Sequence, residues 1–587
     1  MRFNRLALAF LAVSAFADPP TMFPPVRGTR EMVGAANNFE VEAGFRMLVK
    51  GGNAVDAGVA SVLAAAVTEQ ARFGIGGEMP LLVKMAGKPT IAISGVGTAP
   101  KRATVEFYTK RDPEPWEDRG RMPPIPAQGI KSMILPGVFD GIMLALEKNG
   151  TMSFAQVAEP AIEYADGFPL GEEFAGFIRN FQGMLDLWPA SSKFFLPGGK
   201  PPQRSEIFRE PTLAKTLREL VAAEKKARGN RAKKIQAVRD LFYKGDIAKR
   251  VAAFSKDNGG LFDYDDLASF HATIDEPKSG MYRGYEIVKP GFWTQGPVMI
   301  QALQILEGYD LKAMGHNSPQ YLHTVVEAVK LAFADRDRYY GDPKFSKIPE
   351  ETLLSRDYAA ERRKLIDPNR ASMDSRPGAF GGSLGMPSGG TAAEGVHDTT
   401  CVNVVDKWGN VFSATPSGAW LPSVIAGDTG IPLSTRLQSF VVTAGHANQL
   451  APGKRPRVTL SPTIILKDGK PYAAMSTPGG DNQDQAMLQA IINMIDFGMQ
   501  PQEAVEAPRF QSEHFYSSFA GHEFVPGKLN LEGRIPKATV EAMNKLGHRV
   551  NHSTDWSNGS APTVIQIKDG VLNGAADPRR SRFIFGR

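Results

Sequence analysis

The feature of this sequence that most constrains its fold is a β-hairpin that directly follows a stretch rich in chain-breaking residues. Residues 376–395 contain repeated glycines together with prolines, a composition typical of a loop or linker. Residues 402–405 and 411–415 are largely apolar and enclose the polar stretch 406–410, which predicts two strands joined by a tight turn. A linker therefore meets the first strand of a hairpin close to Thr399.

The position of Thr399 allows a specific chemistry. A peptide bond at the junction of a linker and a strand can be cut without breaking the fold, and the cut would leave Thr399 as a new N-terminus. A terminal threonine carries a nucleophile and a base in one residue, because its hydroxyl attacks while its own α-amine takes the proton. From this stretch alone, the alternative that Thr399 and Thr400 are β-branched residues opening a strand stays open.

The order of residues here resembles the γ-glutamyltranspeptidase family of N-terminal-nucleophile hydrolases. Precursors of that family cut themselves before a Thr-Thr or Thr-Ala pair that opens the small subunit and is followed by a Val-Val-Asp-x-x-Gly-Asn hairpin. The matching residues are Thr399-Thr400, Val404-Val405-Asp406 and Gly409-Asn410, and residues 50–57, 74–77 and 327–336 resemble the family's large subunit. The resemblance implies an α+β fold, the four-layer αββα sandwich with two stacked, mostly antiparallel sheets.

The resemblance also implies how the chain is divided. Residues 18–398 would form the large subunit and residues 399–587 the small subunit, with cleavage between Asp398 and Thr399. We expect the two subunits to stay associated as one compact unit, and a homo-oligomer of the processed heterodimer is left open.

The N-terminus predicts export. Residues 1–17 combine a positive start, a short apolar run and an Ala-x-Ala ending, which is typical of a secretory signal peptide. The run is too short to span a bilayer, and no other stretch is long and apolar enough. A periplasmic or secreted protein is therefore expected. The single cysteine, Cys401, excludes an internal disulfide.

Charge and motifs give no sign of nucleic acid, cofactor or metal. The net charge of +6 is small for 587 residues, and the basic run 225–234 is typical of a solvated helix face. The glycines of 74–77 lack the spacing of the common phosphate-binding loops. His323 and Glu327 lie one turn apart on a predicted helix but lack a third ligand, so we expect a structural polar pair.

The catalytic residues follow from matched positions. Ser417 stands on the second hairpin strand, where the family has a threonine whose hydroxyl bonds the nucleophile. Gly479 and Gly480 occupy a predicted strand-to-helix turn, and glycines there let backbone amides point into a cleft at the positive end of a helix dipole. The family places its oxyanion hole at this turn.

The positions that would recognise a glutamyl group depart from the family. Val96 replaces an arginine that grips the α-carboxylate, and Ser439 replaces an aspartate that binds the α-amine. Ala419 replaces a polar contact, Thr459 stands in an altered Ser-Ser pair, and Arg436 replaces a Gln or Glu. Arg436 without a nearby aspartate would suit an anionic acyl group that lacks an ammonium, because an unpaired buried ammonium is costly.

The sequence thus predicts a self-processing amidohydrolase or acyltransferase that acts on a small-molecule amide through an acyl-enzyme on Thr399. The family's default is γ-glutamyl transfer and glutathione hydrolysis. The altered pocket favours an acylase for a non-amino acyl amide, glutaryl-like or oxamate-like, and predicts that γ-glutamyl compounds are poor substrates. A non-catalytic periplasmic binding protein on the same fold is the alternative from another class.

Overall fold

The computed structural model describes residues 21–380, 385–387 and 398–587. Within these residues two seven-stranded sheets form the centre of the molecule. The first sheet has the order β1 (Val26–Gly28), β18 (Val571–Ala576), β17 (Thr563–Lys568), β13 (Lys470–Ser476), β12 (Thr463–Lys467), β9 (Tyr285–Lys289) and β8 (Lys278–Tyr282). The second has the order β19 (Phe583–Gly586), β2 (Met32–Ala35), β10 (Val402–Val405), β11 (Val411–Ala414), β3 (Met79–Lys84), β4 (Thr90–Gly95) and β7 (Thr273–Asp275).

All strand pairs of these two sheets are antiparallel. Two smaller sheets lie outside them. One consists of β14 (Phe510–Ser512), β15 (Lys528–Leu531) and β16 (Arg549–His552), and the other of β5 (Phe168–Pro169) and β6 (Ile207–Phe208).

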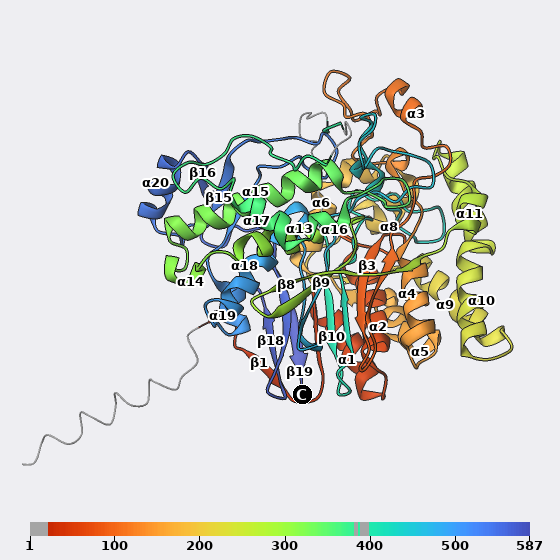
Figure 1. Cartoon of the computed structure of the whole chain (residues 1–587). Coiled ribbons are helices and arrows are strands. Elements are labelled where there is room, and N and C mark those ends of the chain that lie inside the picture. Colours follow the sequence, from red (N-terminus) through yellow and green to blue (C-terminus); the bar gives the residue numbers. More distant parts are fainter. Residues whose placement is uncertain (1–20, 381–384, 388–397) are drawn as a thin grey trace, which may run out of the picture.

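Helices cover the outer face of each large sheet (Figure 1). Those packed with the second sheet are α1 (Asn38–Val49), α2 (Ala54–Thr68), α4 (Val138–Asn149), α5 (Phe154–Asp166), α9 (Pro211–Lys226), α10 (Arg231–Tyr243) and α11 (Asp246–Asp257). Those packed with the first are α13 (Pro297–Leu306), α15 (Pro319–Tyr339), α18 (Gln483–Ile495), α19 (Pro501–Glu506) and α20 (Lys537–Lys545).

The remaining helices are short and lie in the connections. They are α3 (Val105–Lys110), α6 (Glu172–Asn180), α7 (Gln182–Leu185), α8 (Pro189–Phe195), α12 (Tyr264–Ser269), α14 (Leu311–Met314), α16 (Glu350–Leu353) and α17 (Arg356–Arg363).

The two large sheets face each other through an apolar layer to which both contribute. Met32 and Val405 of the second sheet belong to the same buried cluster as Ile464 and Ile565 of the first. Successive strand residues point to opposite faces, so Val402 and Val404 of β10 instead join the cluster formed with α1 and α2. The order helix, sheet, sheet, helix confirms the predicted four-layer αββα sandwich.

The predicted hairpin is present and is tied to α2. Asp406 in its turn accepts hydrogen bonds from the backbone amides of Trp408 (2.9 Å) and Asn410 (3.0 Å) through one carboxylate oxygen. The other oxygen accepts one from the amide of Ala54 (2.8 Å), the first residue of α2. Since Asn53 also caps this helix, the turn and the helix start hold each other in place.

The described part of the chain includes no helix with the length and apolarity needed to cross a membrane. The predicted signal peptide, residues 1–17, and most of the predicted linker lie outside the described residues.

Close packing between α2 and β11 gives a stability prediction. A Cβ atom on Gly58 of α2 would lie 2.4 Å from Cδ1 of Phe412 on β11, and overpacking of this kind typically costs about 1–3 kcal/mol. We therefore expect Gly58→Ala to lower the free energy of unfolding by about that amount, measured by denaturant titration.

The matched control is Gly176→Ala in α6. A Cβ there would meet only the end of the Arg179 side chain, at 3.7 Å, so this variant should be unchanged or more stable by up to about 1 kcal/mol. Equal stability of the two variants would contradict the packing argument.

Candidate active site

Thr399 lies just before β10, opposite Ser417. Ser417 was expected on the second hairpin strand, but it lies three residues beyond the end of β11, because Pro416 interrupts the strand. Thr399 and Ser417 form an antiparallel bridge, and Thr399 Oγ1 lies 3.1 Å from Ser417 Oγ. Both side chains are buried. The backbone amide of Thr400 donates to the carbonyl of Pro416 (3.0 Å), which extends the pairing. The structure thus brings together the predicted nucleophile and the predicted partner hydroxyl.

The carbonyl oxygen of Asp398, on the bond predicted to be cut, accepts two side-chain hydrogen bonds. Ser417 Oγ donates to it at 2.7 Å, and the indole Nε1 of Trp420 also donates to it. Donors aimed at a carbonyl oxygen stabilise the negative charge that develops there when a nucleophile attacks. Sequence reasoning missed Trp420, whose only signal was its place three residues after Ser417.

A buried ion pair stands behind Ser417. Arg436 donates through Nε to Glu78 (2.5 Å) and through Nη2 to Ser417 Oγ (3.2 Å), and its guanidinium carbon lies 4.3 Å from the centre of the Trp420 ring. Burial raises the pKa of Glu78, with the Arg436 charge opposing it. Glu78 was not predicted, although it directly follows the glycine cluster.

The Asp398 side chain is held by two arginines. Its Oδ2 accepts from Arg72 Nε at 2.6 Å and also from Arg580 Nη1, while Oδ1 accepts from the Thr399 amide at 2.8 Å. Burial alone would raise the pKa of this carboxyl, but the charges of Arg580 and Arg72 outweigh it and lower the pKa to about 2. The carboxylate is therefore ionised at neutral pH.

The glycine cluster 74–77 serves backbone packing beside Ser417. A Cβ on Gly77 would lie 2.3 Å from the Ser417 carbonyl oxygen, and one on Gly76 would lie 2.1 Å from the Pro432 carbonyl oxygen. The next residue, Glu78, exchanges backbone hydrogen bonds with Ser417, each 2.9 Å long. The close approach of these backbones explains the glycines without a phosphate ligand.

Gly479 and Gly480 lie in the turn that leads from β13 to α18, as predicted. Their φ angles are 119° and 55°, and a Cβ on Gly479 would lie 2.1 Å from Ser560 Oγ. Both line a pocket of about 230 Å³ together with Phe519, and the Phe519 ring contacts that of Trp420. The turn is therefore linked to the Ser417 region through two aromatic rings.

Val96 and residues close in sequence to Ser439 and Thr459 meet in one buried apolar cluster. Val96 belongs to an apolar cluster with Leu437 and Val458, which are close in sequence to Ser439 and Thr459. The hydroxyls of Ser439 and Thr459 are buried and have no hydrogen-bond partner among the described residues. None of these three positions brings a charge to the region.

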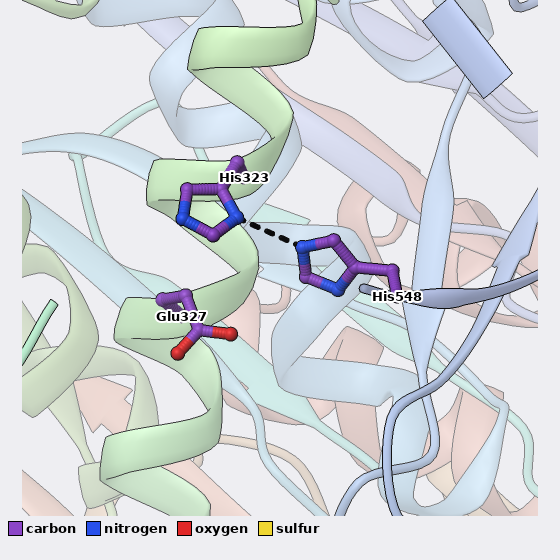
Figure 2. Close-up of side chains that lie close together, drawn as sticks. All are labelled: His323, Glu327 and His548. Atoms are coloured by element: carbon purple, nitrogen blue, oxygen red, sulfur yellow. Dashed lines mark hydrogen bonds between the residues drawn. The ribbon is translucent and has the colours of Figure 1, made fainter. Parts of the chain in front are cut away.

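His323 and Glu327 lie near a third group that the sequence did not reveal, His548 (Figure 2). His323 Nδ1 lies 2.9 Å from His548 Nε2. Both Glu327 oxygens already accept hydrogen bonds from cations, Lys330 Nζ at 2.7 Å and Arg376 Nη2 at 2.8 Å. Burial, followed by the Lys330 charge, lowers the pKa of His548 to about 2. Two cations beside the carboxylate oppose a metal ion, so we retain the interpretation of a structural polar cluster.

Comparisons with known proteins agree with one another. The sequence model described as Gamma-glutamyltranspeptidase matches residues 41–586. The chain is 35% identical to the Acylase ACY 1 proenzyme of Pseudomonas sp. (strain SE83) over 94% of this chain and 92% of that protein. It is 32% identical to the Glutathione hydrolase proenzyme of Escherichia coli (strain K12) over 98% and 97%. The solved cephalosporin acylase from Bacillus halodurans is 27% identical, with a TM-score of 0.83 over 97% of this chain and 98% of that one.

The lowered pKa of Asp398 predicts a pH dependence of stability in an uncut Thr399→Ala chain. Because the folded pKa lies near 2 and the ordinary value is 3.8, the stabilisation is present above pH 3.8 and is lost as the pH falls through 2. Adding Asp398→Asn should therefore lower the free energy of unfolding by about 2 kcal/mol at pH 6 and by about 1 kcal/mol at pH 3. Denaturant titration at each pH measures this difference. Exposed Asp257→Asn is the control, and a cost for Asp398→Asn that does not change with pH would contradict the prediction.

Proposed function

This chain belongs to the gamma-glutamyltranspeptidase family and is an amidohydrolase or acyltransferase of that family, and we propose that it cuts itself before Thr399 and then uses Thr399 as its nucleophile. The observation that carries the proposal is one hydrogen-bonded group of atoms: Thr399 Oγ1, Ser417 Oγ and the Asp398 carbonyl oxygen. A nucleophile, its partner and the oxygen of the bond to be broken are adjacent.

In the proposed processing step, the Thr399 hydroxyl oxygen adds to the carbonyl carbon of Asp398. Ser417 and Trp420 hold the oxygen that becomes negative, and the Arg436 charge lies directly behind Ser417. The bond to the Thr399 nitrogen then breaks, and the hydroxyl proton ends on that nitrogen. Water hydrolyses the resulting ester, which leaves a carboxyl group on Asp398 and a free amine on Thr399.

Turnover would repeat these steps on a substrate amide. The free α-amine of Thr399 takes the hydroxyl proton as the oxygen attacks the substrate's carbonyl carbon. It then passes this proton to the substrate nitrogen as the C–N bond breaks, so the substrate's amine leaves and the acyl group stays on the Thr399 oxygen. The second step passes the acyl group to water or to another amine. We assign oxyanion stabilisation in turnover to Ser417 and Trp420 and, as predicted from the sequence, to the amides of Gly479 and Gly480.

Two subunits made by this cut would remain together because both large sheets contain strands from each side of it. Strands β10 and β11, from residues after 398, are enclosed by β2 and β3, from residues before it. In the other sheet β12 pairs with β9 in the same way. We accordingly propose a large subunit of residues 18–398, a small subunit of 399–587, and export directed by residues 1–17.

We propose that the acyl group lacks an α-amino function. The supporting observation is that Val96, Ser439 and Thr459 offer no charge to an amino-acid head group. Arg436 fits the expected role of acyl-anion contact less well than the sequence indicated, because Glu78 and Ser417 already engage Nε and Nη2. Its role here is to orient Ser417, and Nη1, without a hydrogen-bond partner among the described residues, is the atom left for a substrate.

Processing is tested by Thr399→Ala. This variant should remain a single chain, because it lacks the attacking hydroxyl, whereas Thr399→Ser should still be cut at the same bond. Denaturing gels and sequencing of the new N-terminus give the readout. A Thr399→Ala chain that splits before residue 399 would mean that an outside protease makes the cut.

The two donors to the Asp398 carbonyl are tested by Ser417→Ala and Trp420→Phe. Each should slow conversion of the precursor by about ten- to a thousandfold, the usual range for loss of an oxyanion donor. The control is Trp408→Phe, since Trp408 lies in the hairpin turn with its side chain 49% exposed. A processing rate for Trp420→Phe equal to that of the control would remove Trp420 from the mechanism.

A further inference from the structure

Two arginines enclose the Asp398 carboxylate, and we call their donor atoms, Arg72 Nε and Arg580 Nη1, the cage. Arg72 Nε and Arg580 Nη1 both donate to Oδ2 of this buried side chain. Arg72 is itself fixed by ion pairs with Glu69 (2.8 Å) and with Glu173, so its Nε faces the site in a defined orientation. The Arg580 side chain is 23% exposed. Together these atoms form a ready-made carboxylate site.

Asp398 is also the first acyl group that Thr399 accepts in the proposed processing step. A substrate acyl group must later place its carbonyl carbon at the same hydroxyl and its oxygen at the same donors. Two acyl groups cannot occupy this position at once, so Asp398 has to leave before turnover begins. Its departure leaves Arg72 and Arg580 without the carboxylate that paired them.

We propose that Arg72 and Arg580 bind the free carboxylate of the substrate's acyl group, and that the substrate is therefore a monoamide of a short dicarboxylic acid. This inference rests on the proposed function and adds the substrate class. In Asp398 two carbons, Cα and Cβ, separate the carbonyl from the carboxylate, which is the spacing of a succinyl group. Charge-assisted hydrogen bonds from arginine to a carboxylate are among the strongest available for such recognition.

The same geometry ranks other acyl groups. A malonyl group is one carbon too short to reach both arginines from the Thr399 hydroxyl, and a glutaryl group is one carbon longer than the spacing requires. A γ-glutamyl group has the glutaryl length and also carries an α-ammonium, which would lie beside two guanidinium groups. Like charges at short distance are unfavourable in a poorly solvated site.

The first experiment measures kcat/KM of the cut protein for p-nitroanilides that differ only in the acyl group. The value for the succinyl compound should exceed that for its neutral isostere succinamoyl by at least about 100-fold. A buried site that pairs with a charged group strongly rejects an analogue that lacks this charge. Malonyl, glutaryl and γ-glutamyl should fall below succinyl. Equal values for succinyl and succinamoyl would overturn the inference.

Arg580→Gln should reduce kcat/KM for succinyl-p-nitroanilide by about 30-fold or more while changing that for the butyryl compound by less than about threefold. The control is Arg46→Gln. The Arg46 side chain is 24% exposed, like that of Arg580, and also forms ion pairs, but its partners are Glu42 and Glu163 on the surface. An equal loss for both compounds would make Arg580 a structural residue and overturn the inference.

A second experiment needs no catalytic activity and no processing. In the uncut Thr399→Ala chain, the Asp398 carboxylate occupies the cage. The double variant Thr399→Ala, Asp398→Ala lacks this carboxylate, which is the size of formate. Sodium formate should raise the Tm of the double variant by about 1–2 °C relative to sodium chloride at equal ionic strength. The single variant should show no difference.

The outcomes separate the inference from the proposed function. If the cut protein hydrolyses butyryl and succinyl compounds equally, Thr399 chemistry stands and the carboxylate site is wrong. If formate does not stabilise the double variant, the cage does not bind exchangeable carboxylates and the inference is likewise wrong. If formate binds but no amide is hydrolysed after cleavage, the proposed function fails while the carboxylate site remains.

Discussion

The structure of the site depends on one interaction, the pairing of Thr399 with Ser417 across the start of the hairpin. This pairing extends the β10–β11 hairpin, whose neighbours in the sheet, β2 and β3, come from the other side of the predicted cut. We therefore expect the sheet to hold Thr399 in place after the proposed cut as well. A nucleophile that must act first on its own chain and then on a substrate needs such an invariant support.

Buried charges around this pairing orient groups more than they stabilise the fold. Glu78 with Arg436, and Asp398 with Arg72 and Arg580, are removed from water at a high desolvation cost. In the proposed mechanism each ion pair contacts a reacting group, since Arg436 donates to Ser417 and Asp398 carries the carbonyl that would be attacked. Their orientation, and the field they impose where charge develops, are the consequences that matter for chemistry.

Much of the architecture could be predicted because local signals and distant packing agree. The strands expected at residues 402–405 and 411–415 are β10 and β11, and the turn expected at Gly479 and Gly480 leads from β13 to α18. The role of Arg436 was harder to predict. Its position in the sequence indicated a contact for an acyl anion, but the ion pair with Glu78 depends on two segments that are 358 residues apart, a separation that no local pattern encodes.

The sequence by itself determined the hairpin, the threonine before its first strand, the Ser417 hydroxyl close to its second strand and the glycine turn before α18. Each of these follows from residue types at short spacing, where backbone geometry alone limits the outcome. Only the tertiary structure decided that Trp420 donates to the Asp398 carbonyl and that Arg72 and Arg580 enclose its carboxylate. Side chains from separate segments meet because the sandwich stacks them, and the direction of a buried polar group is set by the partners that satisfy it.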